Sequence, residues 1–296
     1  MNTNTKHFHK YSIPVYLLLA NGITWLCWLP GLIIGLGEGY TMPNFNTYHI
    51  LFETGFANTQ HLLLAIAFFL GVYGPLVGAL VATWMDGGRD GLAEWWGRIT
   101  RWMIGVNWYL STFVIAFLLA AIPVVIFGLI GGFSPSNLPI VYILGLFLAQ
   151  LLQSGFGEEP GWRGFLLPRL KARFEGDKYV WVLGLIWSVW HFPIIIIQTL
   201  SMMQDVTVPQ IVITILISLA GNVMALIGMT HIYAWLYSNT KSVFLSIVFH
   251  ALSNLFMFWL PSFLAVPQAA DLAIALMPWA VVIILQKRLG KDQFPG

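Results

Sequence analysis

The sequence predicts an all-α polytopic membrane protein with about eight transmembrane helices, an interfacial amphipathic helix and both termini in the cytoplasm. Two observations concern composition: 58% of the 296 residues are hydrophobic and only 9% are charged. A soluble domain usually carries about 25% charged residues. So few charges cannot cover a soluble surface, and the apolar excess requires lipid. The third observation is that the cationic residues fall on one side of the predicted spans.

Eight apolar segments are long enough to cross a bilayer, which takes about 20 helical residues. They are 13–36, 62–85, 108–131, 138–157, 180–200, 209–236, 243–264 and 270–286. The first follows a polar N-terminus without a small-residue cleavage site, so we interpret it as a retained span. No soluble domain separates the segments, which predicts a single transmembrane domain over residues 1–296.

All 14 lysines and arginines fall on one side of this arrangement. They precede the first span, follow the last, or lie in the loops after spans two, four and six. The opposite loops contain none: 37–61, 132–137, 201–208 and 265–269. Lysine and arginine favour cytoplasmic loops. The distribution therefore predicts cytoplasmic termini in a multi-pass protein of the cell membrane.

Segment 91–105 lies in the loop after the second span. It carries three tryptophans, an isoleucine and a methionine at helical spacing, with Arg98 and Arg101 interleaved. Aromatic and cationic residues in this pattern predict a helix lying in the membrane interface.

Ionisable side chains within membrane spans are costly, so each one is a functional hypothesis. His191 lies about eleven residues into the fifth span, or roughly 16 Å at 1.5 Å per residue. His250 lies roughly 10 Å into the seventh span by the same measure, and Glu158 ends the fourth. We therefore expect these three side chains to converge in the cytoplasmic half of the membrane.

The local spacing of the polar residues adds detail. His250 and Asn254 are four residues apart and face the same side of a helix. Glu159 and Arg163 have the same spacing and can pair, which leaves Glu158 about 100° away for another role. The proline and glycine that follow the glutamates predict a kink.

This set of groups suits hydrolysis. Glu158 can take a proton from water, while His191 holds that water or shares the proton. His250 and Asn254 can donate hydrogen bonds to a developing oxyanion. Proton-coupled transport and a structural or sensing role are the alternatives. A transporter usually shows an internal repeat, and we find none between the halves of the sequence.

Three motifs follow one another along the chain: Glu-Glu-x-x-x-Arg in EEPGWRG, an aromatic residue four before histidine in WSVWH, and His-x-x-x-Asn in HALSN. In this order they resemble the CPBP family of intramembrane proteases. These are the type II CAAX prenyl endopeptidases, also called the Abi or bacteriocin-immunity family. The resemblance covers residues 153–255, which it marks as the catalytic core.

The resemblance implies a role for each residue of the motifs. Glu158 and His191 would activate the water, and His250 and Asn254 would form the oxyanion hole. These roles agree with those drawn from depth and spacing.

The resemblance also implies three supporting residues. Glu159 and Arg163 occupy positions that are usually read as supporting the site. Trp187 stands where the family commonly has phenylalanine, a change that affects packing more than chemistry.

The family likeness implies a metal-free glutamate mechanism with no cofactor; zinc held by Glu158, His191 and His250 is the alternative. It implies a membrane-embedded or lipidated protein substrate, such as a prenylated CAAX-type C-terminus, reaching a site open to the cytoplasm. The lipid bilayer is the other expected partner, and no nucleic acid is expected. A non-catalytic bacteriocin-immunity protein is a further alternative.

Overall fold

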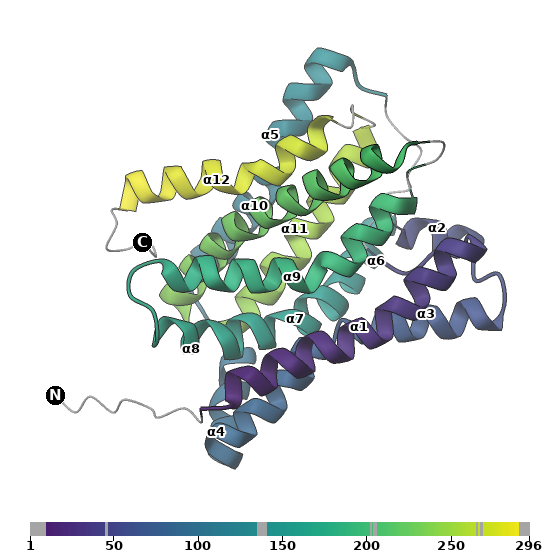
Figure 1. Cartoon of the computed structure of the whole chain (residues 1–296). Coiled ribbons are helices and arrows are strands. Elements are labelled where there is room, and N and C mark those ends of the chain that lie inside the picture. Colours follow the sequence, from purple (N-terminus) through teal and green to yellow (C-terminus); the bar gives the residue numbers. More distant parts are fainter. Residues whose placement is uncertain are drawn as a thin grey trace.

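The computed structural model describes residues 10–44, 47–134, 141–201, 203, 206–264, 266 and 269–289. Every regular element within these ranges is a helix, which confirms the all-α prediction (Figure 1). Several parts of the topology prediction lie outside the described residues: Lys6, Lys291, residues 138–140, and portions of the loops expected at 132–137, 201–208 and 265–269.

The described helices comprise α-helices and two π-helical turns, η1 and η2. In chain order they are α1 (Ser12–Glu38), α2 (Tyr48–Thr54), α3 (Thr59–Gly71), α4 (Gly74–Ile99), α5 (Val106–Gly131), α6 (Val141–Gln150), η1 (Leu151–Gly155), α7 (Phe156–Gly161), η2 (Trp162–Leu166), α8 (Leu167–Lys171), α9 (Lys178–Ser201), α10 (Val208–Thr240), α11 (Val243–Leu264) and α12 (Ala269–Leu289).

Six of the described helices are long and apolar enough to cross a membrane: α1, α5, α9, α10, α11 and α12. The pair α3 and α4, bent by 43°, makes a seventh if it counts as one span. The fourth expected span, 138–157, differs from the prediction. Its described part consists of α6, which has 10 residues, followed by the π-helical turn η1 and the first residues of α7.

The chain stays helical well beyond the expected end of the fourth span. The sequence prediction placed a polar connection at 158–179, but α7, η2 and α8 continue the helix to Lys171. π-Helical turns flank α7, and such turns accommodate local irregularity within a helix. Pro160 therefore sits inside α7, and Glu158 belongs to a buried helix rather than to a loop.

The helix that carries the glutamates packs very closely against its neighbours. A β-carbon added at Gly161 would lie 2.6 Å from the backbone oxygen of Pro75 in α4. One added at Gly155 would lie 2.8 Å from the backbone oxygen of Ile247 in α11. Only glycine permits these approaches, so both neighbouring backbones reach the site region.

The amphipathic segment expected at 91–105 is shorter than predicted. Its helix is the last part of α4, beyond a kink at Gly88 (φ 54°, ψ −137°), and it ends at Ile99. Trp95 is buried there, and its indole N–H donates to the Pro160 oxygen at 3.0 Å. Trp102 is exposed beyond the helix. Its position at a membrane interface stays a prediction.

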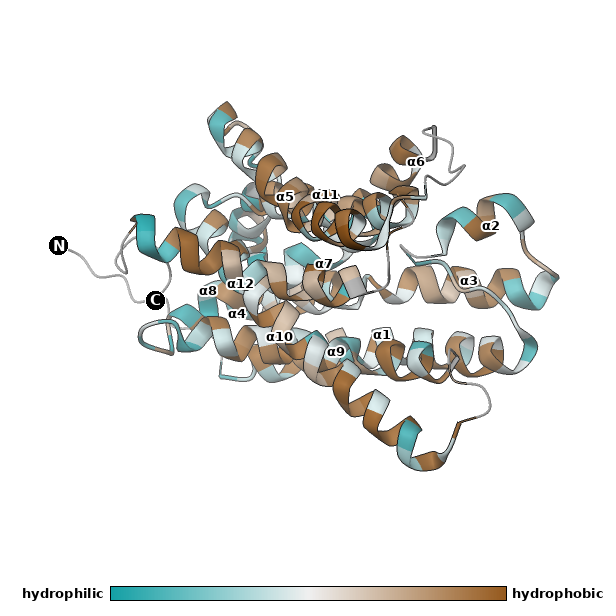
Figure 2. Cartoon of the chain, turned by 90° about the horizontal axis from the view of Figure 1, so that it is seen from above, coloured by the Kyte–Doolittle hydropathy of each residue, from teal (hydrophilic) through white to brown (hydrophobic). Residues whose placement is uncertain are grey.

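Hydrophobic residues, in brown, follow much of the length of many helices (Figure 2), and many of the large ones are exposed on the outside of the bundle. Leu26 in α1 and Leu129 in α5 are each 77% exposed, for example. Such a surface fits lipid contact rather than water. The start of α1 and the end of α12 lie at the same end of the bundle as α8, and α2 lies at the opposite end (Figure 1).

Candidate active site

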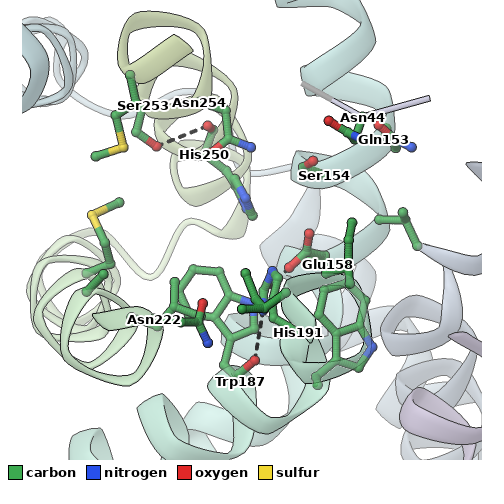
Figure 3. Close-up of a pocket in the computed structure, with 18 of the residues that line it drawn as sticks. Asn44, Gln153, Ser154, Glu158, Trp187, His191, Asn222, His250, Ser253 and Asn254 are labelled. Carbon is green, nitrogen blue, oxygen red and sulfur yellow. Dashed lines mark hydrogen bonds between the residues drawn. The ribbon is translucent and has the colours of Figure 1, made fainter. Parts of the chain in front are cut away.

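The predicted site residues line a cavity of about 260 Å³. Glu158 from α7, His191 from α9, and His250 and Asn254 from α11 all line it (Figure 3). The structure therefore brings together four residues that are separated by up to 96 positions, as the depth argument expects. The roles that the sequence assigned to them stay predictions.

Glu158 is held by a neighbouring tryptophan. Glu158 is only 3% exposed, and the indole N–H of Trp187 donates to its Oε2 at 2.8 Å. A hydrogen bond to a carboxylate is stronger than one between neutral groups. Trp187 therefore fixes the orientation of the carboxylate in a low-dielectric environment, which a phenylalanine at this position could not do.

The orientation of His191 follows from its contact with the backbone. Its Nδ1 lies 2.9 Å from the carbonyl oxygen of Trp187, one turn earlier in α9. A carbonyl only accepts hydrogen bonds, so Nδ1 must carry the proton. In the neutral ring, Nε2 is then an acceptor. The Trp190 ring packs edge-on against His191, with the ring centres 4.6 Å apart.

Glu159 joins His250 to Arg163. Its Oε1 accepts from Arg163 Nη1 at 3.0 Å, the pairing expected from their spacing, and lies 2.8 Å from His250 Nδ1. The Arg163 guanidinium carbon lies 4.1 Å from the centre of the Trp187 ring and 3.7 Å from that of Tyr233. The two rings and the carboxylate hold this buried cation in place.

This arrangement constrains what His250 can do. Its Nδ1–H is directed at Glu159, so Nε2 is an acceptor when the ring is neutral. Nε2 can donate to an oxyanion only when the imidazole is doubly protonated. Glu159 binds Nδ1 and so fixes the orientation of the ring, which links the second glutamate to the expected function of His250.

Asn254 is held by a residue that the sequence argument did not single out. Its Nδ2 donates to Gln150 Oε1 at 2.9 Å, and the same oxygen accepts from Ser154 Oγ at 3.1 Å. Gln150 ends α6 and is 1% exposed. A polar amide in an apolar span was the available signal, since such groups usually bond between helices.

Further polar residues line the cavity without having been predicted: Gln153, Ser154, Asn222, Tyr233 and Ser253. Gln153 accepts a hydrogen bond from the Tyr48 hydroxyl of α2. Pro43 and Asn44, which precede α2, also line the cavity. The cavity therefore extends from Glu158 to the α1–α2 connection, which the charge distribution assigned to the side opposite the cytoplasm.

The zinc alternative needs three ligands close together. Across the part of the chain that the structure describes, no group of three or more histidine, cysteine, aspartate or glutamate side chains is placed to hold a metal ion. Glu158, His191 and His250 share the cavity without forming such a group. The residues as arranged do not fit a zinc site, and no step of the proposed mechanism uses a metal.

The fold and cavity define a multi-helical membrane protein with a buried carboxylate, histidine and amide site. Residues 139–256 match the family model described as "Type II CAAX prenyl endopeptidase Rce1-like". The chain is 33% identical over 128 residues to a protein of Methanococcus maripaludis named "CAAX prenyl protease 2". That match covers 42% of this chain and 42% of the relative's length. Residues 139–256 are therefore similar to type II CAAX prenyl endopeptidases, as the three sequence motifs predict.

Proposed function

We propose that this protein is an intramembrane endopeptidase that hydrolyses a peptide bond with a water molecule activated by Glu158. The observation that carries the proposal is the shared cavity, which Glu158, His191, His250 and Asn254 all line (Figure 3). The similarity of residues 139–256 to the type II CAAX prenyl endopeptidase model and the name of the Methanococcus relative support a peptidase.

In the proposed reaction, Glu158 takes a proton from water, and the water oxygen attacks the carbonyl carbon of the scissile bond. Trp187 holds one carboxylate oxygen at 2.8 Å, so the other oxygen takes the proton. His191 accepts a hydrogen bond from the water through Nε2. Glu158 then delivers the proton to the leaving nitrogen as the carbon–nitrogen bond breaks.

The oxyanion of the tetrahedral intermediate would be stabilised from α11. Protonated His250 donates from Nε2, and Asn254 donates from Nδ2. Both groups are already held by other side chains, His250 by Glu159 and Asn254 by Gln150. Donors that are fixed before the reaction stabilise developing charge without the cost of reorganisation.

We propose a lipidated protein C-terminus, such as a prenylated CAAX-type sequence, as the substrate. Most of the remaining cavity wall is apolar and includes Phe68, Ile194, Leu226, Met229 and Met257. An apolar wall beside a few convergent polar groups suits an apolar chain attached to a peptide. The sequence predicts entry from the cytoplasmic side of the cell membrane, whereas the lining by Pro43 and Asn44 supports an opening towards the α1–α2 end of the bundle.

The test is cleavage of a farnesylated CAAX-type peptide by the purified protein in detergent. We expect cleavage by the wild type and a loss of at least about a thousandfold in Glu158→Gln, because an amide cannot accept the proton from water. Glu175→Gln, at an exposed glutamate between α8 and α9, is the matched control and should retain full activity.

Two further experiments test the lipidated substrate and the metal-free mechanism separately. Cleavage of the peptide without its farnesyl group at an equal rate would contradict the lipidated substrate. Loss of activity with a chelator, restored by added zinc, would contradict the metal-free mechanism. Equal cleavage by wild type and Glu158→Gln would contradict the role of Glu158 in activating water.

A further inference from the structure

We propose that Gln150 is a positioning residue that keeps the Asn254 side chain turned with its N–H₂ group, rather than its oxygen, available to an oxyanion. The inference deepens the proposed function and rests on it for its kinetic part. It assigns a role to a residue outside the three sequence motifs.

The geometry around Gln150 Oε1 carries the inference. This oxygen accepts from Asn254 Nδ2 at 2.9 Å and from Ser154 Oγ at 3.1 Å. Gln150 comes from α6 and Asn254 from α11, 104 positions apart. Gln150 is only 1% exposed, so bulk water is not available to replace it as an acceptor.

A primary amide has two nearly isosteric orientations. Turning the Asn254 amide by 180° exchanges Oδ1 and Nδ2. In the observed orientation, one Nδ2 hydrogen is bound to Gln150 and the second is directed elsewhere. In the turned orientation, Oδ1 would face Gln150 Oε1, and two acceptors without a hydrogen between them repel each other. Gln150 therefore selects one orientation while its own Oε1 faces Asn254, the position in which this oxygen also accepts from Ser154 Oγ.

That selection matters because an oxyanion accepts hydrogen bonds and is repelled by a carbonyl oxygen. An Asn254 amide free to turn would present the correct group for only part of the time. Preorganised donors account for much of the stabilisation in such sites, and removal of one typically costs about 10²–10³ in kcat. Loss of Gln150 should cost less, since Asn254 would still be present.

The first test is a double-mutant cycle with Gln150→Met and Asn254→Ala on the farnesylated peptide. We expect Gln150→Met to lower kcat about tenfold with KM unchanged. In the Asn254→Ala background the same change should cost less than about twofold, because Gln150 acts only through Asn254. A tenfold loss in both backgrounds, or a change confined to KM, would overturn the inference.

Asn21→Leu, at an amide of α1 that does not line the cavity, is the matched control. It removes a hydrogen bond to the Leu17 oxygen within the same helix and leaves Gln150 and Asn254 untouched. We expect kcat within about twofold of the wild type. Thermal melting of each variant in detergent separates positioning from unfolding. An Asn21→Leu protein as impaired as Gln150→Met would indicate general packing instead.

The second test does not depend on catalysis. In protein labelled with ¹⁵N-asparagine, the Asn254 side-chain N–H₂ signal is assigned by its absence in Asn254→Ala. We expect Gln150→Met to shift this signal and speed its exchange with solvent, while Gln150→Glu, which keeps an acceptor oxygen, preserves its protection. An unchanged signal in Gln150→Met would overturn the inference. An inactive wild type would reject the proposed peptidase and leave this spectroscopic result to decide alone.

Discussion

Trp187 shows how one side chain serves two neighbouring charges. Its indole N–H binds Glu158 at 2.8 Å, and its ring lies 4.1 Å from the guanidinium carbon of Arg163. The sequence argument treated this tryptophan as a packing change relative to the phenylalanine common in the family. The structure adds a hydrogen bond to the residue proposed to activate water, so the change also affects chemistry.

For Trp187→Phe we expect kcat/KM to fall about 10- to 100-fold, because the Glu158 carboxylate loses a donor worth about 1.5–3 kcal/mol while the ring over Arg163 is kept. Trp187→Ala should lose far more and melt at a lower temperature, since the ring is lost too. Both values come from kinetics on the farnesylated peptide and melting in detergent. Identical kinetics and melting temperatures for the two variants would contradict separate roles for the indole N–H and the ring.

At the scale of single residues, the sequence showed where polar groups lie but not how they bond. The spacing of Glu159 and Arg163 predicts their pair, and the structure contains it at 3.0 Å. Gln150 was missed because its partner Asn254 is 104 positions away. A contact at that separation depends on how two helices pack, and periodicity along one helix does not reveal it.

At the scale of elements, the segment from η1 to η2 departs most from expectation. The glycines and Pro160 of this segment predict a break in the helix. Tight packing against α4 and α11 nevertheless keeps it helical through two π-helical turns. Tertiary contact overrides local preference here. Glu158 and Glu159 consequently lie inside the bundle, where a loop would have left them in water.

Gly161→Ala tests this packing. The new methyl group would lie 2.6 Å from the backbone oxygen of Pro75, which cannot swing away as a side chain would. We expect a loss of about 1–3 kcal/mol in stability, seen as a lower melting temperature and less monodisperse protein. The control is Gly145→Ala in α6, where a β-carbon meets nothing within 4 Å. Equal melting temperatures for both variants would contradict the close approach of α7 to α4.

At the scale of the whole molecule, composition was sufficient for the class of fold, because 9% charged residues cannot cover a soluble surface. Composition was not sufficient to predict the number of spans. A break within a span is invisible to a count of apolar residues, so six or seven helices among the described residues meet the length requirement instead of eight. Orientation depends on the charge distribution alone and stays a prediction.

The chain offers a direct test of orientation, because Cys27 is its only cysteine. In a Cys27→Ser background, a single cysteine is placed at Glu53, in α2, or at Arg173, between α8 and α9; both positions are exposed. Lysine and arginine favour the cytoplasmic side. An impermeant maleimide should therefore label Glu53→Cys in intact cells and Arg173→Cys only after permeabilisation. The reverse pattern would invert the topology and place the α1–α2 end of the cavity in the cytoplasm.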